Sequence, residues 1–158
     1  MSAPKLAAFA ERRRVVAQAF RWLGTPYHDH AKLLGVGVDC GQLLLAVYAD
    51  AGLIPPTDSG PYSPDWHLHR SEEKYLAWVE TWCVRTSAPL PGDVALFQFG
   101  RCVSHGGIIV SAPSDMHIIH AFKGEGVRLE EVAPNHRLFD RLAGYWTLRT
   151  WAEAEAAA

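Results

Sequence analysis

The spacing of apolar residues changes once along the chain, near Pro89. Before that point, apolar side chains recur at helical spacing over residues 5–23, 40–50 and 71–82. After it, the spacing is that of short β-prone runs separated by turn residues. These runs are residues 94–99, 104–110, 116–122, 127–132 and 145–151. Helices followed by strands predict an α+β fold, with N-terminal helices packed on an antiparallel sheet of about five strands.

Length and charge limit the class of protein further. A chain of 158 residues with 49% hydrophobic residues fits one compact domain, which we expect to cover residues 1–151. A Pro-rich and helical insertion is expected at about 55–90, and a frayed alanine-rich tail at 152–158. The net charge of -2 lacks the basic excess that binds nucleic acid, so we expect no nucleic-acid partner.

The sequence also lacks the signals of membrane insertion and export. It has no run of 18 apolar residues that could span a membrane. Residues 1–14 lack an apolar segment followed by a small-residue cleavage site. We therefore expect synthesis in the cytoplasm without a signal peptide.

Three cysteines form neither an even disulfide framework nor a paired zinc motif, so at least one thiol should be free. Cys40 lies at the expected start of helix 40–50, where backbone amides can lower the pKa of a thiol and bind an oxyanion. A cysteine can equally pack as a small buried hydrophobe. Spacing alone does not choose between these interpretations.

A thiol nucleophile needs a base from another part of the chain. His105 lies in a β-prone run beside Gly106 and Gly107, and glycines in a strand often mark the close approach of another group. It is the candidate base, although a histidine at a strand edge can have no role. His117 and His120 compete to orient it, and strand alternation lets only one of them face the site.

His120 is the better candidate for the orienting group. It shares its strand face with Ile118 and Phe122, and the small side chain of Ala121 leaves space nearby. Alternation alone does not say which face of the strand holds the site.

Five segments occur in the order seen in NlpC/P60 cell-wall hydrolases. They are RWLGTPY at 21–27, VDCGQLL at 38–44, PGDVALF at 91–97, SHGGI at 104–108 and IIHA at 118–121. The chain resembles this family over nearly its whole length. It is most similar to the single-domain branch of phage tails and prophage or gene-transfer particles, because the insertion at 55–89 and the PGDVALF run recur there.

The resemblance implies a papain-like core and a cysteine peptidase or amidase that needs no cofactor or metal. Its motifs map the catalytic set onto Cys40, His105 and His120. They map a tyrosine near the nucleophile onto Tyr27 and a ligand of the peptide's free amino end onto Asp39. Ser104 joins them in the expected substrate-binding or oxyanion set.

The expected substrate is the stem peptide of peptidoglycan, cut at the bond between γ-D-glutamate and the diamino acid. Phage tail-tip proteins are possible partners by the same resemblance. The protein would then act at the cell wall as part of a phage-like tail, or after secretion or lysis.

The chain departs from the family pattern at two places. Gly41-Gln42 stands where the family usually has Ser-Gly, so a serine contact to the substrate amine is missing. His28-Asp29-His30 and a longer loop replace the Gly-Gly pair that often follows the tyrosine. The chemistry of the nucleophile tolerates both departures, but they can change which substrate the site accepts.

Three alternatives stay open. Cys40, His105 and His120 could hold zinc, and the close pairs His28/His30 and His67/His69 add to that possibility, but these pairs have no matching cysteines. The same fold could serve as a non-catalytic peptide-binding or tail component. The cysteine could also transfer its acyl group to an amine. Labelling of Cys40 by iodoacetamide below the pH at which an ordinary thiol reacts would favour an enzyme.

Overall fold

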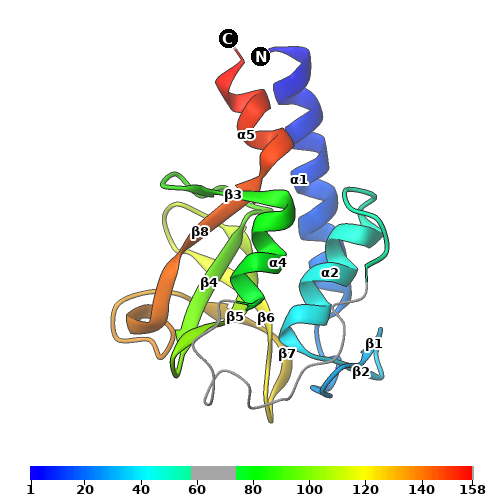
Figure 1. The fold of residues 1–158 in the computed structure, drawn as a ribbon, viewed down its shortest axis with the longest axis vertical. Coiled ribbons are helices and arrows are strands. Elements are labelled where there is room, and N and C mark those ends of the chain that lie inside the picture. The colour runs from blue at the N-terminus through cyan, green and yellow to red at the C-terminus, as the bar shows by residue number, and fades with distance from the viewer. Residues whose placement is uncertain (58–73, 158) are drawn as a thin grey trace.

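The computed structural model describes residues 1–57 and 74–157. The helices are α1 (Ala3–Arg21), α2 (Cys40–Asp50), α4 (Lys74–Trp82), α5 (Arg149–Ala156) and the short 3-10 helix η1 (Phe139–Arg141). The strands are β1 (Lys32–Leu33), β2 (Gly37–Val38), β3 (Cys83–Thr86), β4 (Val94–Phe99), β5 (Cys102–Ser111), β6 (His117–Phe122), β7 (Gly126–Glu131) and β8 (Leu142–Leu148). Helices come first and the sheet follows, as the change of spacing predicts (Figure 1).

The main sheet has six strands in the order β3-β8-β4-β5-β6-β7, and neighbouring strands are antiparallel throughout. The predicted α+β class with an antiparallel sheet is confirmed, although the expected number of strands was five. The additional strand is β3, which follows α4 directly. Its four residues include the polar Arg85 and Thr86, and so short a run shows no readable alternation.

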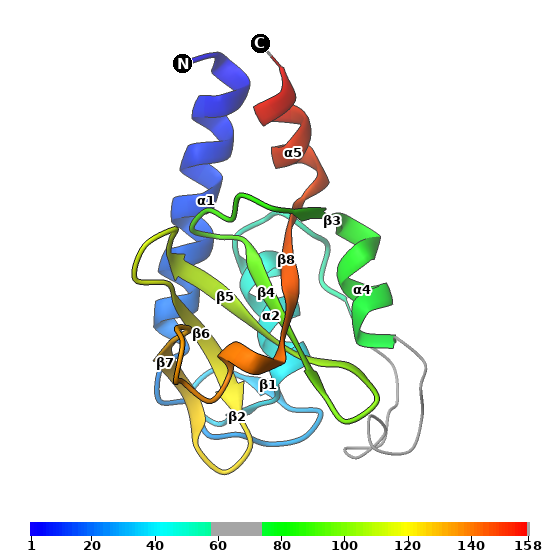
Figure 2. The ribbon, with the colours of Figure 1, turned by 90° about the vertical axis from the view of Figure 1, so that its left-hand side faces the viewer.

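The C-terminal prediction was wrong. Strand β8 ends at Leu148 instead of residue 151, and most of the expected frayed tail belongs to α5. Alanine and glutamate favour a helix here, and α5 buries Trp151 and Ala154. Figure 2 shows α5 beside α1, with the two ends of the chain close together. Packing on α1 therefore orders a segment that looks featureless in the sequence.

The other helices agree with their predicted ranges. Helix α1 is followed by Gly24 at φ +83°, where an L side chain would be strained. Helix α2 covers the predicted range of residues 40–50. The predicted first turn of α4 at 71–73 lies outside the described residues, as does much of the insertion expected at 55–90.

Helices α1, α2 and α4 share one core with the face of the sheet that they cover. Leu43 and Val47 of α2 meet Leu96 and Ile108 of the sheet in this core. A second, smaller cluster lies on the opposite face of the sheet. Its buried members are Ala95, Phe97, Ile109, Met116, Ile118, Val132 and Leu138. The central strands β4 and β5 are therefore buried on both faces and form a rigid base for the site.

A buried ion pair ties α1 to the sheet. The guanidinium of Arg12 donates to Asp93 Oδ1 at 2.7 Å and to Thr147 Oγ1 at 3.1 Å. It also stacks over the ring of Trp151, 4.3 Å from the centroid. One side chain thus joins α1, the turn before β4, the end of β8 and α5.

Replacing Arg12 by Met should lower the free energy of unfolding by about 3–5 kcal/mol, because Asp93 would be left buried without its partner. Chemical denaturation followed by circular dichroism measures this difference. Arg13→Met is the matched control, since Arg13 is exposed and its loss should change stability by about 0.5 kcal/mol at most. A loss below about 1 kcal/mol for Arg12→Met would contradict the proposed role of the pair.

Candidate active site

Cys40 is the first residue of α2, and Asp39 caps this helix. Asp39 Oδ1 accepts a hydrogen bond from the amide of Gln42 at 2.8 Å, and Oδ2 accepts one from the amide of His30 at 2.8 Å. The carboxylate is buried, with 2% of the residue exposed. Asp39 therefore fixes where α2 begins and attaches the loop before it, so the position of Cys40 is well determined.

The thiol of Cys40 approaches the sheet at strand β5. It donates a hydrogen bond to the carbonyl oxygen of Ser104, with the sulfur 3.6 Å away. Ser104 directly precedes His105, and the pairing of β4 with β5 shifts register beside it. Among the described residues, no hydrogen bond joins Cys40 to the His105 ring. Such bonds are often long or misaligned in free enzymes and tighten when substrate binds.

Tyr75 of α4 completes the surroundings of the nucleophile. Its hydroxyl donates to the carbonyl oxygen of Cys40 at 3.2 Å and also acts to lower the pKa of the thiol. A Cβ atom at Gly106 would lie 2.9 Å from this hydroxyl and 2.8 Å from Leu96 Cδ2. The glycine beside His105 therefore leaves room for Tyr75, which is the close approach that the sequence indicated.

The expectation of a lowered thiol pKa was wrong. Cys40 is half-buried. Its partial loss of water raises the pKa of the thiol to about 12, and the nearby charge of Asp39 adds to the effect. The hydroxyl of Tyr75 and the amides of Gly41 and Cys40 oppose this shift without cancelling it. The thiol is therefore neutral near pH 7. Slow labelling by iodoacetamide no longer separates an enzyme from a binding module.

The two histidines of the predicted site lie against each other. His105 Nε2 is 2.8 Å from His120 Nδ1, and the two rings meet edge to face. The residues are buried, with exposed fractions of 7% and 0%. Rings of Phe97, Phe99 and Phe122 pack around them. His117 lies elsewhere, bonded to Ser111 and to the carbonyl oxygen of Asp115.

Burial also keeps both imidazoles neutral. Loss of water lowers the pKa of His105 well below its ordinary value, and the charge of Arg137 lowers it further. Loss of water likewise lowers the pKa of His120, although Glu130 acts in the opposite direction. A neutral thiol and neutral imidazoles thus coexist near pH 7.

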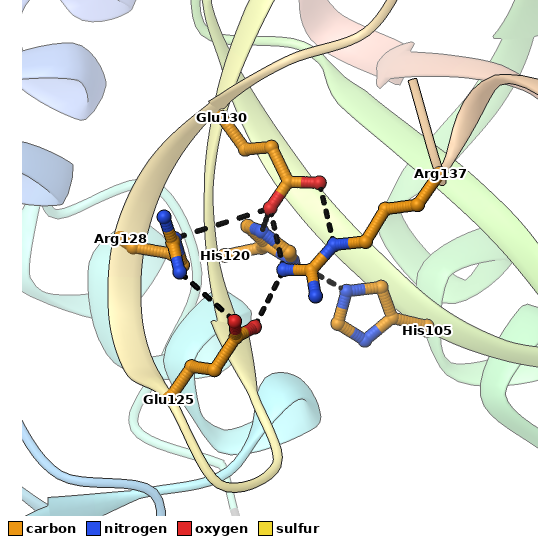
Figure 3. A network of polar contacts seen from close by, with 6 residues as sticks. All are labelled: His105, His120, Glu125, Arg128, Glu130 and Arg137. Carbon is orange, nitrogen blue, oxygen red and sulfur yellow. Dashed lines mark hydrogen bonds and ion pairs between the residues drawn. The ribbon is translucent and has the colours of Figure 1, made fainter. Parts of the chain in front are cut away.

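The second ring nitrogen of His120 contacts a carboxylate, Glu130, that the sequence analysis did not single out. His120 Nε2 lies 3.2 Å from Glu130 Oε1 (Figure 3). Arg137 donates to both oxygens of Glu130, at 2.7 and 2.9 Å. In the sheet, Arg128 faces His120 directly, so Glu130 lies two residues along on the same strand face. Only this register reveals the contact, which explains why sequence patterns missed it.

Two further predicted site residues, Tyr27 and Ser104, lie near the nucleophile. Tyr27 is half-buried. Burial raises its pKa, and the nearby Cys40, Asp39 and Asp29 raise it further, so this hydroxyl is neutral. The Ser104 hydroxyl donates to the carbonyl oxygen of Phe99 at 3.4 Å, and its contact with the thiol is made by its own carbonyl. Tyr75 was read from the sequence only as part of an apolar helix stripe, and no signal there separated it from the core.

The described residues contain no group of three or more histidine, cysteine or acidic side chains arranged to hold a metal ion. His67 and His69 lie outside the described residues. Within residues 1–57 and 74–157, no helix is both long and apolar enough to cross a membrane.

Comparisons with known proteins agree with this architecture. The sequence pattern of the NlpC/P60 family matches residues 17–150. No curated protein matches the chain. Among solved structures, the NlpC/P60 domain of the peptidoglycan hydrolase SagA has a TM-score of 0.53 and 22% identity, covering 77% of this chain and 89% of that domain.

Two further structures show the same fold. A protein of the NLP/P60 family from Staphylococcus aureus subsp. aureus Mu50 has a TM-score of 0.61 and 18% identity, covering 88% of this chain but 41% of that one. An N-acetylmuramoyl-L-alanine amidase from Bacteroides uniformis ATCC 8492 has a TM-score of 0.54 and 14% identity, covering 89% and 98%. The family match covers most of the sequence, so the chain belongs to the NlpC/P60 family.

The buried histidines should make stability fall in mild acid. Their folded pKa values lie below the ordinary 6.5, so the unfolded chain binds more protons as the pH drops through 6.5. Each histidine then costs about 1.4 kcal/mol per pH unit until its folded pKa is reached. Denaturation midpoints at pH 7.5 and 5.5 measure the loss.

A smaller loss in His105→Phe, which keeps an aromatic ring in the cluster, would assign the effect to this residue. His28→Gln, at an exposed position, should behave as wild type. Equal losses in wild type and His105→Phe would contradict the assignment.

Proposed function

We propose that this chain is a cysteine peptidase or amidase that cuts the stem peptide of peptidoglycan, with Cys40 as nucleophile and His105 as base. The observation that carries the proposal is the thiol at the start of α2, 3.6 Å from the carbonyl of the residue before His105. His105 is in turn bonded to His120. The substrate class is taken from the peptidoglycan hydrolase SagA, whose NlpC/P60 domain has the same fold.

The reaction begins from neutral groups. The thiol leaves the carbonyl of Ser104 and turns toward His105, which takes its proton as the sulfur attacks the amide carbonyl. A carbon–sulfur bond forms, and the carbonyl oxygen becomes an oxyanion. His105 then returns the proton to the leaving amine as the carbon–nitrogen bond breaks. Water, deprotonated by His105, hydrolyses the thioester and restores the thiol.

Backbone amides at the start of α2 are suited to stabilise the oxyanion. The amides of Cys40 and Gly41 already act on the sulfur, where they lower the pKa of the thiol. The amide of Gln42 is occupied by the Asp39 carboxylate. In this proposal the first two amides bind the oxyanion, assisted by the hydroxyl of Tyr27.

The bond between γ-D-glutamate and the diamino acid is the proposed point of cleavage, by resemblance to the family. Asp39 would receive the free amino end of the peptide. Asp29 lies close enough to Tyr27 to raise the pKa of its hydroxyl, which adds a second carboxylate to this acidic end of the site. Two carboxylates favour a cationic amine there.

Delivery to the wall is part of the proposal. The insertion at 55–89 and the PGDVALF run of residues 91–97 resemble the phage-tail and prophage branch of the family, which supports incorporation into a tail tip beside tail-tip proteins. Secretion or lysis would bring the same site to the same substrate.

Acyl transfer is the alternative that shares this site. Water and an amine can both attack a thioester, so the two activities differ only in the final step. Product analysis with an added amine separates hydrolysis from transfer.

Cys40→Ala should abolish cleavage of purified peptidoglycan while the fold persists, because the variant lacks the sulfur that forms the thioester. Mass spectrometry of the released muropeptides measures the nucleophile and the cleaved bond together. New termini at γ-D-glutamate and at the diamino acid are the expected products.

Cys83→Ala provides the matched control. Burial raises the pKa of Cys83 to about 12, as it does for Cys40, but Cys83 lies on edge strand β3. Turnover should therefore survive in Cys83→Ala. Cleavage by Cys40→Ala at the wild-type rate would remove the proposal, and a folded wild type that binds the peptide without cutting it would identify a binding module.

A further inference from the structure

Glu130 lies at the centre of a charged network on the rim of the buried histidine pair. Arg137 bridges Glu130 and Glu125, and Arg128 donates to Glu125 at 3.0 Å (Figure 3). The guanidinium of Arg137 also lies over the ring of Phe122, 4.0 Å from its centroid, and that ring packs against both histidines. Arg128 Nε lies 4.0 Å from Glu130 Oε1, so both arginines contact the Glu130 carboxylate.

Glu130 is ionised in these surroundings. Burial by itself raises the pKa of its carboxyl, but the hydrogen bond from Arg137 and the charge of that guanidinium outweigh burial and lower it. An ionised carboxylate only accepts hydrogen bonds. His120 must therefore carry its proton on Nε2, the nitrogen that faces Glu130.

The tautomer of His120 decides that of its neighbour. A neutral imidazole has one N–H group and one lone pair, so a proton on Nε2 leaves Nδ1 of His120 as an acceptor. His105 faces this acceptor with its Nε2 at 2.8 Å, so it must donate from that nitrogen. Its own Nδ1 then carries the lone pair.

We infer that Glu130 is a positioning residue that sets the tautomer of His105 through His120, and so keeps Nδ1 of His105 free to take the proton of Cys40. This inference rests on the proposed function for its catalytic meaning, but the tautomers themselves do not depend on it. Without the carboxylate, His120 can carry its proton on Nδ1 and donate to His105. His105 would then hold its own proton on Nδ1, where it cannot act as base.

Nitrogen NMR of the full chain labelled with ¹⁵N-histidine tests the tautomers directly, because protonated and lone-pair ring nitrogens have well separated shifts. At pH 7.5, wild type should show both His105 and His120 with the proton on Nε2. Glu130→Ala should show a substantial Nδ1–H population at both residues. Unchanged tautomers in Glu130→Ala, or a proton on Nδ1 of His105 in wild type, would overturn the inference.

Kinetics supply the second arm. Glu130→Ala should lower kcat by about 10- to 100-fold with KM changed little, since the lost function is orientation of the base. Glu130→Gln keeps an acceptor oxygen and should recover part of the loss. Glu125→Gln is the matched control, because Glu125 binds the same two arginines without contacting His120, and its kcat should stay within about twofold.

The outcomes separate this inference from the proposed function. If Glu130→Ala alters the tautomers but wild type cleaves no peptide, the tautomer assignment stands and the proposed hydrolase activity is wrong. If wild type cleaves the peptide and kcat is unchanged in Glu130→Ala, the proposed hydrolase activity stands and the proposed role of Glu130 is wrong. An equal loss in Glu125→Gln and Glu130→Ala would also remove it, because stability of the charged network would then explain both.

Discussion

Burial where α2 meets strand β5, partial for Cys40 and nearly complete for His105, is the constraint on which the site depends. It raises the pKa of the Cys40 thiol and lowers the pKa of His105, so each group is most stable without charge. The direction of each hydrogen bond becomes important, because a neutral base works only if the correct nitrogen carries the lone pair.

The fold holds these groups on rigid elements. Asp39 fixes the first turn of α2, and the glycines of β5 let neighbours approach closely. A Cβ atom at Gly107 would lie 2.7 Å from Ile118 Cδ1 and 3.1 Å from His120 Cβ, so β6 can pack near enough for the histidine pair to form. On the other side, Gly106 makes room for Tyr75. One pair of small residues thus serves both faces of the strand.

The sequence predicted the elements in which apolar residues recur at a clear helical or strand spacing. It missed the features that depend on contacts between distant parts of the chain. The start of α2 at Cys40 and the α+β order followed from local patterns. Helix α5 was missed because its order comes from Trp151 packing near α1, whose Glu11 accepts a bond from that indole. The sign of the Cys40 pKa shift was missed because helix amides are local, whereas burial arises from the whole fold. Glu130 became visible only with the register of β6 and β7.

The most direct test is the ultraviolet absorbance of thiolate, compared as a function of pH in wild type and Cys40→Ala. A thiol whose pKa is raised to about 12 should give the two proteins the same thiolate signal around neutral pH. The difference should develop only in strongly alkaline solution. A thiolate signal at pH 7 that Cys40→Ala removes would show a preformed ion pair, and the account of a site run by neutral groups would be wrong.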